Sequence, residues 1–178
     1  AQPVLTKAMK LFLIGYMGCG KSSLGRRVAR RLDVRFVDTD SVIEEREGAS
    51  ISDIFQYEGE EYFRRLERSI IEEVASEESD AVVSTGGGAP AWGDNMDIMN
   101  RAGTTVYIRR PAEQIVSRLS PYGRMKRPKL RGLSDEEIVD FMKRNMAERE
   151  PFYSRAQHVL DTVGVSDNAL ADMVVDIF

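Results

Sequence analysis

The chain has 178 residues, of which 42% are hydrophobic and 30% charged, and its formal net charge is −4. This size favours one domain, and the acidic balance argues against a surface built to bind nucleic acid. The single cysteine excludes an internal disulfide framework, and the single histidine excludes a metal site made of several histidines. No apolar run reaches the ~18–20 residues of a membrane span. We expect a cytoplasmic protein, a monomer, with no membrane or nucleic-acid partner.

The first eight residues, 1–8, differ from the rest of the chain. They show no hydrophobic periodicity and precede Met9 and an abrupt apolar run. We expect a tag remnant or a disordered leader that takes no part in the fold. Residues 9–178 contain neither a repeat nor a linker and are expected to form a single domain.

Apolar runs and helical patterns alternate along this domain. The expected strands are 11–14, 34–37, 81–83, 105–108 and 158–160. Helical patterns cover 22–32, 58–76, 111–119 and 135–149, and a last helix opens at Ser166 or Asp167. Such alternation predicts an α/β protein with a parallel sheet.

Residues 15–22 read GYMGCGKS and match G-x-x-x-x-G-K-[ST] between an expected strand and an expected helix. Glycines let backbone N–H groups converge on phosphate oxygens, and the following helix presents its positive end. Lys21 can bridge the β- and γ-phosphates, and the Ser22 hydroxyl can ligate Mg²⁺. The stretch predicts a nucleotide site; the alternative is a tight glycine turn with a capping serine.

The rest of the sequence narrows the class of nucleotide-binding protein. A GTPase would show an N-K-x-D motif, which is absent. A motor or transporter ATPase would show an apolar strand ending in an acid, whereas the run 81–83 is followed by Ser84. These absences favour a small-molecule kinase.

Residues 36–40 read FVDTD and place two carboxylates at the end of an expected strand. Residues i and i+2 of a strand face the same side, so Asp38 and Asp40 are expected in one crevice at the carboxyl ends of the sheet. One carboxylate can hold the water shell of a metal while the other meets an attacking hydroxyl. The alternative is that Asp40 caps a helix beginning at Ser41.

The stretch 58–76 is the clearest helical pattern. Its period of four predicts a buried stripe made of Tyr62, Leu66, Ile70 and Val74. Arg64 and Glu67 lie three positions apart on one face. Composition alone favours a surface ion pair here, and Arg149 in a later helix looks equally ordinary.

Two further stretches remain open at this point. The run STGGG at 84–88 is a flexible turn by composition alone. Residues 124–131, RMKRPKLR, hold five cations within the long non-periodic stretch 120–133. They are either a solvated loop or a loop that meets a polyanion.

Taken together, six motifs resemble the shikimate kinase family over essentially all of residues 9–178. They are GYMGCGKSS at 15–23, DTD at 38–40, FRRLE at 63–67, STGGG at 84–88, RP at 127–128 and REPFY at 149–153. The resemblance implies a three-layer P-loop kinase fold, similar to nucleoside-monophosphate kinases, with five parallel strands in the order 2-3-1-4-5 and a mobile lid at about 120–133. It also implies transfer of the γ-phosphate of ATP, with Mg²⁺, to the 3-hydroxyl of shikimate in aromatic amino acid biosynthesis.

The resemblance also implies site residues. The catalytic set is Asp40, Lys21 and Arg127, with Asp40 as base or orienter, and the metal set is Ser22 and Asp38. The substrate set is Asp40, Phe55, Phe63, Arg64, Glu67, Gly86, Gly87, Gly88 and Arg149, with the two arginines on the carboxylate. The nucleotide set is Gly15, Gly18, Cys19, Gly20, Lys21, Ser22, Ser23, Arg124 and Arg127.

The chain departs from the family pattern in the lid and the phosphate loop. Lys129 stands where the lid motif usually has an apolar residue, and either Arg118 or Arg124 is the candidate adenine-stacking arginine. Cys19 is expected to fill space, the alternative being a thiol of lowered pKa. The competing functions are a kinase for another hydroxy acid such as gluconate, a non-catalytic nucleotide-binding module, and nucleic-acid binding through 124–131.

The triple glycine is interpreted as the floor of the shikimate pocket. Side chains there would block a small polar ring, and their absence exposes backbone N–H groups to substrate oxygens. We expect Gly87→Ala to impair use of shikimate while leaving ATP binding nearly intact.

Overall fold

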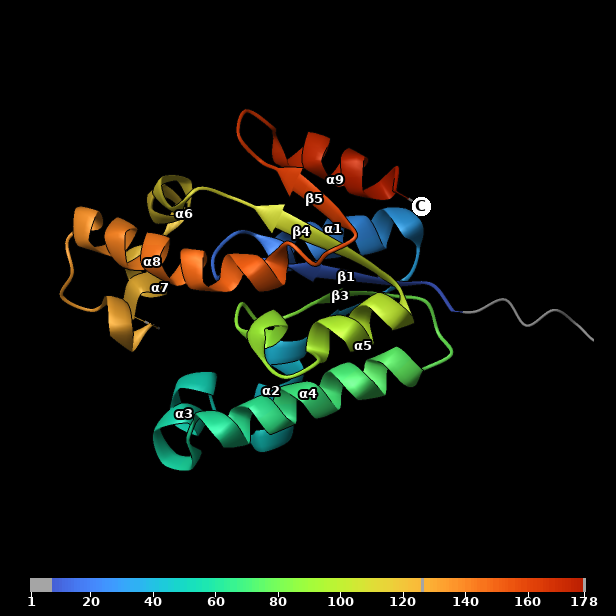
Figure 1. Ribbon diagram of the computed structural model, residues 1–178, viewed down its shortest axis with the longest axis horizontal. Helices are drawn as coiled ribbons and strands as arrows, with labels where there is room; N and C mark the ends of the chain where they lie inside the picture. The colour runs from blue at the N-terminus through green and yellow to red at the C-terminus, as the bar shows by residue number, and fades with distance from the viewer. Residues whose placement is uncertain (1–7, 126, 178) are drawn as a thin grey trace, which may run out of the picture.

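Five parallel strands form the centre of the protein, which is described from a computed structural model (Figure 1). The description covers residues 8–125 and 127–177 without the Arg124 side chain, so nearly all of the expected leader lies outside it. The strands are β1 (Lys10–Ile14), β2 (Arg35–Asp38), β3 (Ala81–Ser84), β4 (Thr104–Arg109) and β5 (His158–Asp161). Their order, β2-β3-β1-β4-β5, and their parallel pairing confirm the predicted sheet.

Helices cover both faces of this sheet. In chain order they are α1 (Lys21–Leu32), α2 (Thr39–Glu47), α3 (Ile51–Glu58), α4 (Glu60–Ser76), α5 (Asn95–Ala102), α6 (Ala112–Arg118), α7 (Pro121–Met125), α8 (Asp135–Tyr153) and α9 (Asp167–Val175). Two short 3₁₀ turns, η1 (Ala89–Ala91) and η2 (Pro128–Leu130), complete the elements. Helices α1 and α9 lie on one side of the sheet and α4 and α5 on the other, which gives three layers (Figure 1).

The burial of the central strands explains why their positions could be predicted from the sequence. Every residue of β1 and of β3 is buried. A parallel strand covered by helices on both faces has no solvent side, so it reads as a continuous apolar run. The edge strand β5 is mostly exposed and has the weakest signal.

The predicted helix 58–76 is shorter and rotated relative to the expectation. Gly59, with φ +91°, separates α3 from α4 in a conformation that glycine adopts readily. Tyr62 is 37% exposed, so the predicted buried stripe was wrong at that position. The buried face instead runs through Phe63, Glu67 and Ile70, because α4 packs against α2, α3 and α5.

Other helix boundaries agree closely with the sequence signals. Ser134 and Glu137 form the predicted capping box of α8, with both reciprocal hydrogen bonds present. Ser166 caps α9. Pro111 stands just before the first turn of α6, and α8 continues four residues beyond its expected end to Tyr153.

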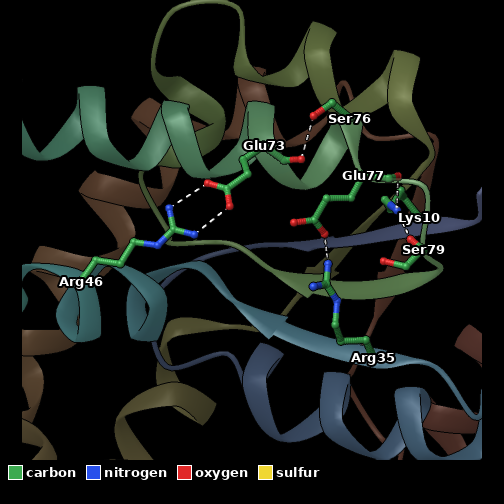
Figure 2. A network of polar contacts seen from close by, with 7 residues as sticks. All are labelled: Lys10, Arg35, Arg46, Glu73, Ser76, Glu77 and Ser79. Atoms are coloured by element: carbon green, nitrogen blue, oxygen red, sulfur yellow. Dashed lines mark hydrogen bonds and ion pairs between the residues drawn. The ribbon is translucent and has the colours of Figure 1, made fainter.

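A polar network occupies the amino-terminal end of the sheet (Figure 2). The buried Lys10 donates to the backbone carbonyls of Glu77 and Ser79, and Arg35 pairs with the Glu77 carboxylate. Arg46 of α2 makes two hydrogen bonds of 2.7 Å to Glu73 of α4. The network therefore fastens the end of α4 to the first residues of β1 and β2.

Candidate active site

The phosphate loop joins β1 to α1 at the carboxyl end of the sheet. Gly15, Gly18 and Gly20 have φ values of +150°, +75° and +96°, conformations that other residues adopt at a cost. A Cβ on Gly15 would also lie 2.7 Å from the carbonyl oxygen of Ile108. The motif glycines are therefore required by the backbone path itself.

Lys21 opens α1 and lies against the loop backbone. Its Nζ donates to the carbonyls of Gly15 at 2.7 Å and Tyr16 at 2.9 Å, and the side chain is buried. Cys19 is 1% exposed, with its sulfur 3.7 Å from that ammonium. Such burial supports the space-filling interpretation of Cys19.

Ser22 and Asp38 form an oxygen-rich pair beneath the loop. The Ser22 hydroxyl donates to Asp38 Oδ2 at 2.6 Å and lies 3.4 Å from the Ser84 hydroxyl. Mg²⁺ prefers oxygen ligands, commonly one or two carboxylates plus water and substrate phosphates. The donor set fits that ion, and within the described part of the chain no cluster of three or more acidic, histidine or cysteine side chains offers a fuller cage.

The structure corrects the local geometry predicted for the DTD motif. Asp38 ends β2 and caps α2, because its Oδ1 accepts the backbone N–H groups of Asp40 at 3.1 Å and Ser41 at 3.3 Å. The chain therefore enters a helix at Thr39, and Asp40 lies in the first helical turn instead of on a strand. The alternation argument was wrong, and so was the alternative that Asp40 is the cap.

Asp40 nevertheless faces the glycine run together with Glu67. Asp40 Oδ1 and Glu67 Oε2 are buried oxygens without a hydrogen-bond partner. A Cβ on Gly86 would lie 2.9 Å from the first and 2.6 Å from the second. Buried acceptors are normally paired, so two that converge on one point indicate a place for a ligand's donors.

The same burial shifts the titration of both carboxyls. Desolvation, with the charge of Asp38, raises the pKa of Asp40 to about 6. Desolvation raises the pKa of Glu67 to about 7, although the adjacent Arg64 lowers it. Carboxyls of raised pKa in one crevice are typical of a functional site.

Arg64 is buried as well, so the interpretation as a surface pair was wrong. It is 8% exposed and donates to Glu67 Oε1 at 2.8 Å. Its guanidinium lies 5.2 Å and 5.9 Å from the ring centroids of Phe63 and Phe55. A Cβ on Gly88 would overlap this guanidinium, so the third glycine of the run makes room for Arg64.

Gly87 connects the glycine run to the phosphate loop and to α8. A Cβ there would lie 2.9 Å from the Met17 nitrogen and 3.5 Å from Arg149 Nη1. The Tyr153 hydroxyl donates to the Gly87 carbonyl at 2.5 Å from a fully buried ring. Tyr153 belongs to the REPFY motif, but residue spacing alone does not predict which group its hydroxyl contacts.

The lid segment brings Arg127 toward this crevice. Its Nη1 donates to the Gly123 carbonyl at 3.0 Å. Burial lowers the pKa of Arg127, while Tyr16 and Asp40 lie near enough to oppose that shift. Lys129 is exposed whereas Leu130 is 1% exposed, so the unusual lysine adds charge without disturbing packing.

A separate cavity lies beside the first turn of α1. Gly20, Ser23, Arg118 and Asp167 contribute to its lining. Arg118 donates to Asp167 Oδ1 at 3.1 Å, which holds its guanidinium at this place. Of the two candidate adenine-stacking arginines, Arg118 thus lines a cavity beside the phosphate loop, whereas the Arg124 side chain lies outside the described residues.

Comparison with known proteins agrees with the geometry. The family described as Shikimate kinase matches residues 17–177. The chain belongs to the shikimate kinase family. The shikimate kinase of Bacteroides thetaiotaomicron is 42% identical over 159 residues, 89% of this chain and 90% of that protein. That of Phocaeicola vulgatus is 42% identical over 167 residues, 94% of each chain.

Solved shikimate kinases have the same architecture. The crystal structure of the Bacteroides thetaiotaomicron enzyme superimposes with a TM-score of 0.82 at 39% identity, covering 95% of both chains. The Acinetobacter baumannii shikimate kinase, solved in complex with shikimate, gives a TM-score of 0.83 at 30% identity and covers 96% of this chain and 92% of that one. The predicted family, P-loop fold and enzyme class are confirmed.

Proposed function

We propose that this member of the shikimate kinase family transfers the γ-phosphoryl group of ATP to the 3-hydroxyl of shikimate. The observation that carries the proposal is the pair of unpartnered carboxylate oxygens, from Asp40 and Glu67, above Gly86. Their position next to both the phosphate loop and a buried arginine suits a small acid that carries several hydroxyl groups.

Asp40 is the residue proposed to meet the attacking hydroxyl. With a pKa of about 6 its carboxyl is largely ionised at neutral pH and remains basic enough to accept a proton. Glu67 binds a neighbouring ring hydroxyl and holds Arg64 through the 2.8 Å ion pair. Both acceptors are then satisfied by the substrate.

Arg64 and Arg149 are proposed to bind the substrate carboxylate. A guanidinium offers parallel donors that match a carboxylate bidentately. Phe55 and Phe63, whose ring centroids are 4.7 Å apart, form an apolar wall beside Arg64. Because Gly86 and Gly88 lack side chains, the carboxylates and Arg64 can lie against the glycine run, and the ring of the substrate is proposed to bind beside them.

The nucleotide phosphates are proposed to lie on the backbone of Gly15, Gly18, Cys19 and Gly20, with Lys21 and Arg127 as their cations. Ser22, and Asp38 through water, would hold Mg²⁺, which supplies countercharge to the phosphate oxygens when bound. Ser23 and Arg118 face the nucleoside in the cavity beside α1. The segment 120–133 is proposed to close as a lid and exclude water, which would otherwise compete with the acceptor.

The proposal includes a monomer in the cytoplasm without membrane or nucleic-acid partners. Within the residues that the structure describes, no helix has both the length and the apolar character that crossing a bilayer requires. The net charge of −4 further supports a small-molecule partner over a polyanion.

The deciding experiment is a coupled ADP-release assay with ATP, Mg²⁺ and either shikimate or gluconate. We expect ADP release with shikimate as the acceptor and none with gluconate. The kcat of Asp40→Asn should be lower by about 10²–10⁴-fold, the usual contribution of a general base. Glu45→Gln, an exposed position on the same helix, is the matched control and should keep full activity. Turnover with gluconate only would overturn the substrate, and near-normal kcat in Asp40→Asn would overturn the role of Asp40.

A further inference from the structure

The cavity beside α1 contains a cation that the motifs do not explain. Arg110 follows β4 and lines this cavity together with Gly20 and Arg118. None of the lining residues belongs to the glycine run or to α2, α4 and α8, which surround the proposed acceptor site. The cavity is therefore a separate part of the nucleotide-side surface.

Arg110 is buried without an acidic partner. It is 6% exposed, its Nε donates to the Cys19 carbonyl at 3.0 Å, and its Nη1 donates to Gln114 Oε1 at 3.2 Å. Among the described residues no carboxylate lies within ion-pair distance of its guanidinium. A buried cation whose hydrogen bonds go only to neutral groups is expensive unless a ligand supplies the opposite charge.

Two guanidiniums approach the same point. A Cβ built on Gly20 would lie 4.0 Å from Arg110 Nη2 and 3.8 Å from Arg118 Nη1. Gly20 is also the N-cap of α1, where the helix presents its positive end. Asp167 forms an ion pair of 3.1 Å with Arg118, and its charge also acts on Arg110 from beyond ion-pair distance. One carboxylate therefore faces two guanidiniums, which leaves an excess of positive charge.

The order of the phosphate groups along the nucleotide indicates which of them lies beside Arg110. Lys21 and Ser22 are assigned to the β- and γ-phosphates, next to the acceptor. The next phosphate along the nucleotide then lies toward Gly20 and Ser23, on the side of the cavity. We propose that Arg110 is a nucleotide-binding residue that donates a hydrogen bond to the α-phosphate, an inference that rests on the proposed nucleotide site but not on the identity of the acceptor.

The test uses the two diastereomers of ADPαS, in which sulfur replaces one or the other non-bridging α-oxygen. Calorimetry on the full chain with Mg²⁺ and without acceptor gives their affinities and that of ADP. We expect the unaltered protein to prefer one diastereomer by about fivefold or more. Arg110→Met should weaken ADP binding about tenfold or more, the cost of a lost hydrogen bond between charged groups. In this variant the two diastereomers of ADPαS should bind with nearly equal affinity, so that the ratio of their affinities is close to one.

Two further variants make the result decisive. Arg109→Met removes the neighbouring, exposed arginine that pairs with Asp161, and it should leave the ratio unchanged. Arg110→Lys keeps the positive charge and replaces Arg110→Met if that variant fails to fold. Its affinity for ADP should stay within about threefold of that of the unaltered protein. Most of the difference in affinity between the diastereomers should be lost, because a lysine lacks the fork of donors. A preserved ratio in both Arg110 variants, or no preference in the unaltered protein, would mean that Arg110 only holds the Cys19 carbonyl. Binding without turnover on shikimate would instead contradict the proposed function and leave this inference intact.

Discussion

The two glycine-rich segments of this kinase use glycine for different reasons. In the phosphate loop, Gly15, Gly18 and Gly20 all have positive φ. In the run 86–88 none does, and there a side chain would instead collide with the carboxylates, the phosphate loop or Arg64. The first segment needs glycine for its backbone path, and the second needs it for the absence of a Cβ.

The largest effect is expected where both reasons coincide. Gly15 combines positive φ with a Cβ position 2.7 Å from a backbone carbonyl that cannot rotate away. Gly15→Ala should lower the free energy of unfolding by about 3 kcal/mol and the affinity for ATP by about 100-fold. Urea unfolding and calorimetry measure the two quantities.

Gly48 provides the control for the phosphate loop. Its φ is +62°, but no atom lies within 4 Å of its Cβ position. Gly48→Ala carries backbone strain alone and should cost about 1 kcal/mol of stability with unchanged kinetics. Equal losses in the two variants would show that space plays no part at Gly15.

Gly86→Ala should separate the second segment from the first. Its backbone conformation suits alanine, but the methyl group would push aside Asp40 and Glu67. We expect the KM for shikimate to rise about 30-fold, equivalent to about 2 kcal/mol, with ATP affinity within twofold. A comparable loss of ATP affinity would contradict the assignment of Gly86 to the acceptor side alone.

Gly87→Ala tests the place where the segments touch. The sequence-based expectation was that ATP binding would survive this change. Because the Cβ position lies 2.9 Å from the Met17 nitrogen, we now expect the affinity for ATP to fall about tenfold and the KM for shikimate to rise about tenfold. Steady-state kinetics with each substrate varied in turn distinguish the outcomes, and an unchanged ATP affinity would restore the original expectation.

The smallest effect concerns pH and the acceptor side only. The pKa of Glu67 rises from 4.5 to about 7 on folding, so between these values the folded chain holds a proton that the unfolded chain has released. Its contribution to the free energy of unfolding therefore falls as pH rises through this window. Urea unfolding at pH 5 and at pH 7.5 should show that the free energy of unfolding of the unaltered protein falls relative to that of Glu67→Gln as the pH rises. A constant difference would mean that Glu67 titrates normally.

Much of the fold could be predicted because both faces of the central strands are covered. Four helices are absent from the predicted set: α3, α5 and α7, together with α2, which stood only as an alternative to an extended DTD motif. The α2 segment has only Val42 and Ile43 as aliphatic residues, and the break at Gly59 is invisible to periodicity. A pair at i and i+3 on a helix has the same sequence spacing whether it faces water or a crevice. The burial of Arg64 and Glu67 could therefore be established only from the structure.

The DTD motif shows the same limit at the scale of one residue. The residue types were informative, but only the hydrogen bonds decide which aspartate caps the helix. Asp38 both caps α2 and accepts from Ser22, and Asp40 reaches Gly86 from the first helical turn. The hydrogen bonds that Arg110 and Tyr153 donate to the carbonyls of Cys19 and Gly87 could not be predicted, because a backbone carbonyl has no sequence signal of its own.

The polar network around Lys10, Arg35 and Glu77 (Figure 2) lies at the end of the sheet opposite the candidate active site. Thermal tolerance can therefore be adjusted at one end of the strands while the reacting groups at the other end keep their positions. Ion pairs such as Arg46 and Glu73 are suitable places to begin when engineering a hardier or a more labile variant of this enzyme. The same separation would let natural substitutions at this end of the sheet change stability while the activity is retained.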